Sequence, residues 1–148
     1  MSFVRPGAVA AYARVGVESG VESADPHRLI LMLFEGALVA IGRARAAMLA
    51  RDPRTKGECV SRAIQIVEQG LKASLDEAAG GELTRQLRSL YDYVAGRMLI
   101  ASASNDPAGL DEAAQLLGQL KDAWEAMPAA AQLRSSAPSA VTRPAAAR

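Results

Sequence analysis

Very few side chains in this sequence could carry out chemistry. Its 148 residues include one histidine, His27, and one cysteine, Cys59. A single histidine cannot build a His-rich metal cluster, and Cys59 has no histidine near it in the sequence to activate its thiol. The sequence also contains neither a glycine-rich phosphate loop nor a nucleophile elbow. We therefore expect no catalytic residue, no metal and no cofactor, and predict that the protein is not an enzyme.

His27 leaves one enzymatic alternative open, which is histidine phosphotransfer by a helical bundle. The reactive histidine of such a bundle should lie in the middle of a helix, on an exposed face. His27 instead follows Pro26 directly, at a position typical of the first turn of a helix. We interpret it as part of a helix start and keep phosphotransfer as the least favoured function.

The charges argue against nucleic acid and membrane partners. Residues 1–127 hold 14 basic and 16 acidic side chains, a net charge of −2, whereas residues 128–148 hold three arginines and no acid. Because basic and acidic residues are interleaved, no basic stripe for nucleic acid is present. The longest apolar run, Leu29 to Phe34, is too short to span a membrane. With one cysteine and no secretory signal, the sequence predicts a cytosolic protein without membrane insertion.

Apolar residues recur at alternating steps of three and four, which is the period of an amphipathic helix. Asp25-Pro26 predicts a first helix that ends near Arg51, and a second is expected from Lys56 to Ala78, ended by Gly80-Gly81. The third is expected from Glu82 to about Ser104, and Asp106-Pro107 predicts a fourth that ends near Met127. Four such helices joined by short turns predict an all-α fold, an antiparallel up-down four-helix bundle.

Two segments fall outside this pattern. Residues 1–24 contain a short apolar piece, Ala8 to Val17, and are expected to form an N-terminal cap segment that is partly helical. Residues 128–148 are rich in Ala, Pro and Arg and are expected to be a disordered tail. The predicted domain organisation is therefore 1–24, 25–127 and 128–148.

Several stretches, in this order, resemble the FliS family of flagellin export chaperones. They are Ala11–Val15, Asp25–Ala37, Gly80–Leu83 and Leu90–Val94, and the similarity extends from about Ala8 to Met127. The resemblance implies a cytosolic chaperone that binds the disordered C-terminal segment of flagellin, prevents premature polymerisation and delivers flagellin to the flagellar type III export apparatus. Physically, this is binding of a partner helix in a groove of a preformed bundle.

The resemblance also implies a second role, docking at an export gate component, for Val9 and Tyr12. An anti-sigma factor or another regulator is kept as a secondary partner, and apolar grooves make weak self-association plausible. The alternative function is an all-α adaptor that binds another flagellar regulatory or export protein.

The second and third helices carry more apolar residues than one core-facing stripe needs, and such a surplus often marks a binding surface. The surplus residues are Ile66, Leu75, Tyr91 and Tyr93. Leu117, Leu120 and Trp124 of the fourth helix are assigned to the core. The predicted flagellin-binding groove consists of Ile64, Ile66, Val67, Leu71, Leu75, Leu87, Tyr91, Asp92 and Tyr93.

Overall fold

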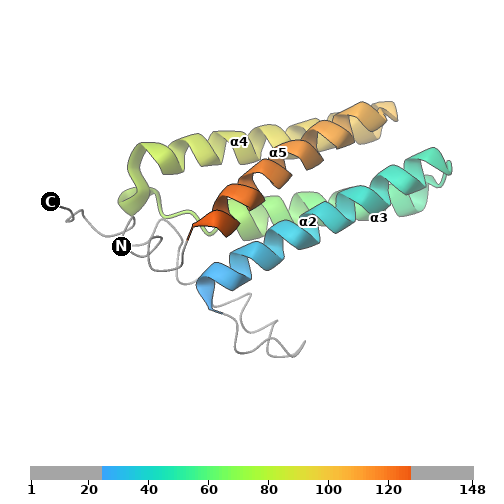
Figure 1. The fold of residues 1–148 in the computed structure, drawn as a ribbon. Helices are drawn as coiled ribbons and strands as arrows, with labels where there is room; N and C mark the ends of the chain where they lie inside the picture. Colours follow the sequence, from blue (N-terminus) through green and yellow to red (C-terminus); the bar gives the residue numbers. More distant parts are fainter. Residues whose placement is uncertain (1–24, 128–148) are drawn as a thin grey trace, which may run out of the picture.

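The computed structural model describes residues 25–127, which form an antiparallel four-helix bundle (Figure 1). The bundle begins with α2 (Pro26–Leu49) and α3 (Pro53–Gln65), which continues into the π-helix η1 (Ile66–Lys72). It ends with α4 (Glu77–Ser104) and α5 (Pro107–Ala126). Successive helices are in contact and α5 contacts α2, which closes the ring. The predicted fold class is thus confirmed, while the predicted N-terminal segment and C-terminal tail lie outside the described residues.

Three of the helices begin with the same Asp-Pro pair. The carboxylate of Asp25 accepts from the backbone N–H of Arg28 at 2.8 Å, and that of Asp52 accepts from Thr55 at 3.2 Å. Asp106 accepts in the same way from the backbone N–H of Ala108 at 3.1 Å. Each aspartate satisfies an N–H that has no partner within its helix, and the proline that follows fits the first helical position. The predicted starts of the first and fourth helices are confirmed.

Two turns with matching geometry form one end of the bundle, which we call the distal end. Arg51 between α2 and α3, and Asn105 between α4 and α5, both adopt left-handed backbone angles, with φ of 58° and 51°. In each turn the next residue, Asp52 or Asp106, donates its N–H to a carbonyl five residues back, at 2.9 Å. This hydrogen bond closes a helix end that continues directly into the N-cap of the next helix.

The predicted boundaries of the two middle helices are wrong at the opposite end, which we call the proximal end. There the second helix ends at Lys72 instead of Ala78, and the third starts at Glu77 instead of Glu82. Gly80-Gly81 therefore lies inside α4. Asp76 starts α4 early by accepting from the N–H of Ala79, and Gly81, at φ 61° and ψ −135°, produces a kink that any other residue would resist. At the distal end the second helix starts at Pro53 instead of Lys56, because Asp52 provides its N-cap.

The core is built largely from aliphatic side chains and alanines, and the small residues let the helices approach closely. α5 approaches α4 closely at Gly109. A Cβ on Gly109 would lie 2.6 Å from the Cβ of Ala101 and 2.5 Å from Nη1 of Arg97. Glycine is therefore needed here for its size.

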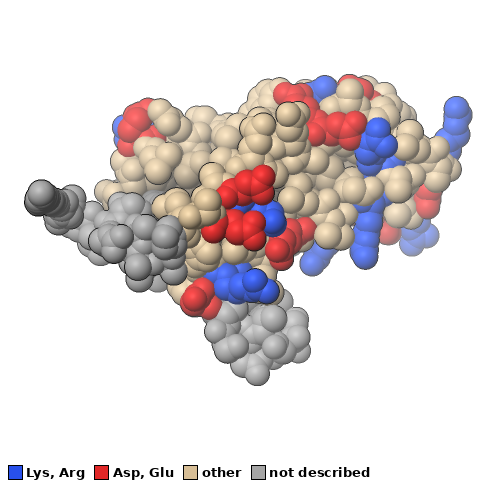
Figure 2. All heavy atoms as spheres, viewed as in Figure 1, with Lys and Arg blue, Asp and Glu red and all other residues tan. Residues whose placement is uncertain are grey.

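Charged side chains are distributed unevenly over the bundle surface. Figure 2 shows Lys and Arg side chains projecting near the end of the molecule where α2 meets α3, with Asp and Glu gathered nearer the middle of the viewed face. None of the helices in residues 25–127 is long and apolar enough to cross a membrane.

Candidate binding site

An apolar pocket of about 180 Å³ opens at the proximal end of the bundle. Four helices contribute to its wall. Its lining consists of Ile30, Phe34, Leu71, Ser74, Leu75, Leu83, Leu87, Tyr91, Leu120, Ala123, Trp124 and Met127. The polar group of Ser74 is satisfied, because its hydroxyl donates to the carbonyl of Gly70 at 2.5 Å. The pocket therefore offers a partner apolar contact and almost no free hydrogen-bonding group.

The π-helix η1 forms one wall of the pocket. Its i+5 hydrogen bonding widens the turn relative to an α-helix, and π-helical segments are frequent at functional sites. Gly70, which is buried, has low helix propensity and lies within this segment. Leu71 in this segment and Leu75, three residues after its end, are 2% and 3% exposed and line the pocket. The departure from α-helical geometry thus falls at the site.

The first turns of α4 form the facing wall. After the kink at Gly81, the chain presents Leu83, Leu87 and Tyr91 at successive spacings of four residues, on one face of the helix. Leu83 lies at the rim, where 54% of its surface is exposed, whereas Tyr91 is 4% exposed. Burial raises the pKa of the Tyr91 phenol, so this wall stays uncharged. The exposure of Leu83 marks where a partner can approach.

The α2 and α5 walls are joined by a reciprocal contact between His27 and Trp124. The two rings are stacked with their centroids 5.5 Å apart, and the indole Nε1–H donates to the carbonyl of His27 at 3.1 Å. Nε2 of His27 lies 3.2 Å from the carbonyl of Trp124 and 3.1 Å from that of Met127. Carbonyl oxygens only accept, so Nε2 carries the proton. The predicted role of His27 in a helix start is therefore incomplete, because its ring also reaches the end of α5.

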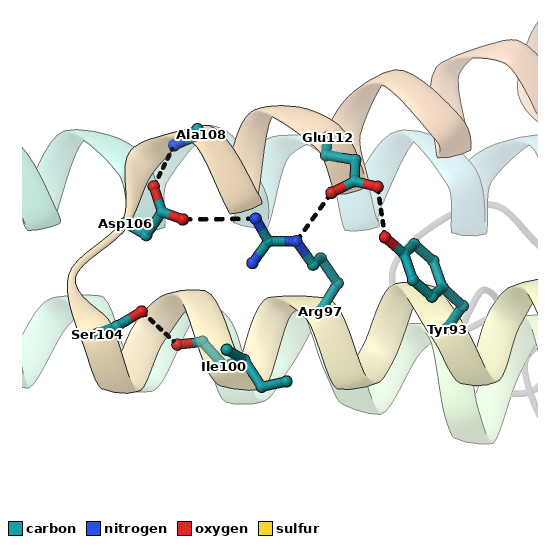
Figure 3. Close-up of polar contacts among 7 residues, drawn as sticks. All are labelled: Tyr93, Arg97, Ile100, Ser104, Asp106, Ala108 and Glu112. Atoms are coloured by element: carbon teal, nitrogen blue, oxygen red, sulfur yellow. Dashed lines mark hydrogen bonds and ion pairs between the residues drawn. The ribbon is translucent and has the colours of Figure 1, made fainter.

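A polar network joins α4 to α5 and extends to Asp106 in the distal turn (Figure 3). The Tyr93 hydroxyl donates to Glu112 at 2.5 Å, and Arg97 pairs with Glu112 at 2.8 Å and with Asp106 at 3.4 Å. The hydrogen bonds from Tyr93 and Arg97 hold the pKa of the Glu112 carboxyl below its ordinary range. Tyr93 is thus engaged in a link between two helices.

A second link joins η1 to α4. Nζ of Lys72 lies 2.5 Å from the carboxylate of Asp92 and 3.1 Å from that of Glu68. These two carboxylates, Asp92 first, raise the pKa of the Lys72 ammonium. Glu68 and Lys72 lie four residues apart, a spacing that places both side chains on one face of the helix. The link holds the two predicted groove-bearing helices together at the level of Asp92.

The predicted groove residues fall into two groups. Four of them line the pocket, namely Leu71, Leu75, Leu87 and Tyr91. The others lie elsewhere in the bundle. Ile66 and Val67 are buried in the core, Ile64 is partly buried against it, and Asp92 and Tyr93 make the polar links described above. Val9 and Tyr12 lie outside the described residues.

The prediction missed every pocket residue contributed by α2 and α5. Their apolar stripes were assigned to the core, and the periodicity gave no sign that the stripes of Phe34 and Trp124 extend beyond the packed interior at one end. Across residues 25–127, no group of three or more His, Cys, Asp and Glu side chains could hold a metal ion.

The bundle and its apolar pocket define an all-α protein suited to binding a partner segment. A family model described as flagellar protein FliS matches residues 8–131. The chain is 44% identical over 128 residues to the flagellar secretion chaperone FliS of Salmonella typhimurium, across 86% of this chain and 95% of that protein.

Two further relatives agree. The flagellar secretion chaperone FliS of Escherichia coli K12 is 44% identical over 115 residues, across 78% of this chain and 85% of that protein. That of Bacillus subtilis is 31% identical over 108 residues, across 73% and 79%. This chain belongs to the FliS family of flagellar secretion chaperones, and it is therefore a chaperone and not an enzyme.

Proposed function

We propose that this protein binds the disordered C-terminal segment of flagellin in the cytosol, keeps flagellin from polymerising and delivers it to the export apparatus. Membership of the FliS family supports a flagellar export client, and the apolar pocket supports a client that presents apolar side chains. The pocket at the proximal end is the observation that carries the proposal. A client helix that packs its apolar face over this pocket buries apolar surface, and it leaves no buried polar group without a hydrogen-bond partner.

The C-terminal segment of the client becomes ordered only when it binds, and the entropy lost in ordering lowers the affinity of the complex. A lower affinity suits a complex that must later be taken apart. We further propose that Val9 and Tyr12 dock the loaded chaperone at the export gate. Tyr12→Ala should then abolish binding to the isolated gate component while leaving flagellin binding and the melting temperature unchanged.

Calorimetric titration with a peptide covering roughly the last 40 residues of flagellin from the same organism tests the first proposal. A peptide of this length is long enough to wrap around the bundle. Binding should be one-to-one, with a gain in helicity by circular dichroism and a negative heat-capacity change. Absence of binding at high micromolar peptide, with a folded bundle, would overturn it.

Two exposed leucines of α4 provide a matched pair of variants. Leu83, at the pocket rim, is 54% exposed, and Leu99, which does not line the pocket, is 62% exposed. A charge at either position should disturb folding little. Leu83→Glu should weaken peptide binding by roughly tenfold, the loss typical of an interface residue worth more than 1 kcal/mol. Leu99→Glu should bind within about twofold of the unmodified protein, and equal losses would contradict the placement of the site.

A further inference from the structure

We propose that His27 is a positioning residue for the client-binding pocket: it holds Trp124 in place so that the pocket accepts one large apolar side chain of the client. This inference rests on the proposed function and deepens it. The three hydrogen bonds and the ring stack between His27 and the end of α5 are its basis.

The His27–Trp124 contact is continuous with the pocket. Ile30 and Phe34 lie three and seven residues after His27, on the same face of α2, and both line the pocket. Trp124 and Met127, whose carbonyls face Nε2 of His27, line it from α5. The contact therefore joins the two helices that form one side of the pocket, at the end of the bundle where α2 begins and α5 ends.

The contact also restrains the Trp124 ring in two directions. Stacking on the imidazole, with the ring planes 17° apart, fixes the tilt of the indole. The hydrogen bond from Nε1 to the carbonyl of His27 fixes its rotation. An indole held at both its face and its edge is a rigid wall, and a rigid wall is selective for size.

The volume indicates what the pocket holds. A dry apolar cavity of about 150 Å³ accommodates a benzene molecule. The pocket here, at about 180 Å³ and lined almost entirely by carbon, suits one side chain of the size of Leu, Met or Phe. The client is expected to place one such anchor residue in it.

Trp124 is the sole tryptophan of the chain, so its fluorescence reports on the pocket. Adding the flagellin C-terminal peptide, in a version without tryptophan, to the full chain should shift the emission of Trp124. His27→Ala should weaken peptide binding by roughly tenfold or more. Arg28→Ala, an exposed neighbour on the same turn, should bind as the unmodified protein does. Circular dichroism establishes that each variant is folded at the temperature of the titration.

Two further substitutions separate the ring stack from the hydrogen bonds and serve if His27→Ala does not fold. His27→Phe keeps a stacked ring and loses the donor to the α5 carbonyls, whereas His27→Gln keeps a donor and loses the ring. We expect His27→Gln to retain more of the affinity, because two carbonyls at the end of α5 otherwise lose their partner.

A double-mutant cycle distinguishes positioning from a general loss of stability. Each large apolar residue of the peptide is replaced in turn by Ala and titrated against the unmodified protein and against a folded His27 variant. At one anchor position, the loss caused by truncation should be at least fivefold smaller in the variant. The inference would be overturned, and the proposed function kept, by a folded His27 variant with unchanged affinity for the peptide. The same holds if each peptide truncation weakens binding equally in the variant and in the unmodified protein. Failure of the unmodified protein to bind the peptide would instead overturn the proposed function.

Discussion

The two ends of the bundle are built differently. At the distal end, two turns share one backbone geometry, with a left-handed residue followed by an Asp N-cap and a Pro. Lys56 ties them together, since its ammonium donates to the carbonyl of Ser102 at 2.9 Å and to Oδ1 of Asn105 at 2.8 Å. At the proximal end, a π-helix, a kink at Gly81 and an apolar pocket replace regular packing.

The difference indicates that the two ends of the bundle have different roles. The distal end satisfies its backbone, and the open hollow of about 560 Å³ beside its turns is lined in part by charged side chains such as Arg51, Asp52 and Lys56. The smaller proximal pocket is lined almost entirely by large apolar side chains. Of these two hollows, only the proximal one is apolar enough to bury a large apolar side chain of a partner. Four substitutions test this contrast.

Gly109→Ala should have the largest effect, because it forces α5 away from α4 near the distal end. The added Cβ would lie 2.6 Å from that of Ala101, which is fixed by the backbone of α4. Overpacking of this kind lowers the free energy of unfolding by about 1–3 kcal/mol. Gly118→Ala, on the same helix with no atom within 4 Å of the new Cβ, should leave stability unchanged or raise it. Urea unfolding measures both, and equal effects would show that the contact at Gly109 can relax.

Lys56→Met should have the next largest effect. It removes a cation from the C-terminal end of α4, where the helix dipole favours positive charge, together with two hydrogen bonds. We expect a loss of about 1–2 kcal/mol in the free energy of unfolding. Arg54→Met is the control, because the Arg54 side chain is 89% exposed and pairs only weakly with Glu58. A loss at Lys56 no greater than that at Arg54 would contradict its role as the distal tie.

Thr84→Val addresses the proximal end and should act in the opposite direction. Thr84 is fully buried in the first part of α4, and its hydroxyl has no hydrogen-bond partner among the described residues. Replacing it with the isosteric Val should raise the free energy of unfolding by about 1 kcal/mol. Thr55→Val, at an exposed position of α3 where the Thr55 side chain hydrogen-bonds to the Asp52 carboxyl, should instead lower the free energy of unfolding slightly. Thermal melts of both variants check the sign.

Glu112→Gln should have the smallest effect and a distinct dependence on pH. Its folded-state pKa lies below the ordinary value of 4.5, so the stabilisation is complete above that value and is lost as the pH falls through the folded pKa. The variant should therefore be less stable than the unmodified protein at pH 7 and equal to it in strong acid. Urea unfolding across this range measures the convergence, with the exposed Glu35→Gln as control. A difference that persists unchanged in acid would contradict the network of Figure 3.

The number of helices and the starts of the first and fourth helices could be predicted because their signals are local. The same signal at Asp52-Pro53 was overlooked, so the second helix was expected to start only at Lys56. Asp-Pro pairs start helices wherever they occur outside a strand, and the apolar period predicts which face is buried. The proximal boundaries could not be predicted from the same rules. Gly80-Gly81 has the composition of a helix end, yet the carboxylate of Asp76 starts α4 before it and Gly81 accommodates the kink. No sequence pattern distinguishes η1 from the α-helix before it.

Only a part of the pocket wall, which comes from the second and third helices, could be predicted. Leu75 and Tyr91 were predicted from surplus apolar character, and Leu71 and Leu87 were predicted with them as groove residues; all four line the pocket. Trp124 was assigned to the core because a core stripe and a pocket wall have the same period. Whether the last residues of an apolar stripe pack in the core or line a pocket depends on where the neighbouring helices end.

The π-helix has a consequence for aligning this chain with its relatives. Each residue of an α-helix turns the chain by about 100°, so an inserted residue normally rotates everything after it off its buried face. A turn closed by i+5 hydrogen bonds absorbs one extra residue and leaves the faces before and after it in register. A relative that is one residue shorter between Ile66 and Lys72 can therefore bury the same faces on both sides. A one-residue gap at this place in an alignment marks a change of helix type, and the fold on either side is retained.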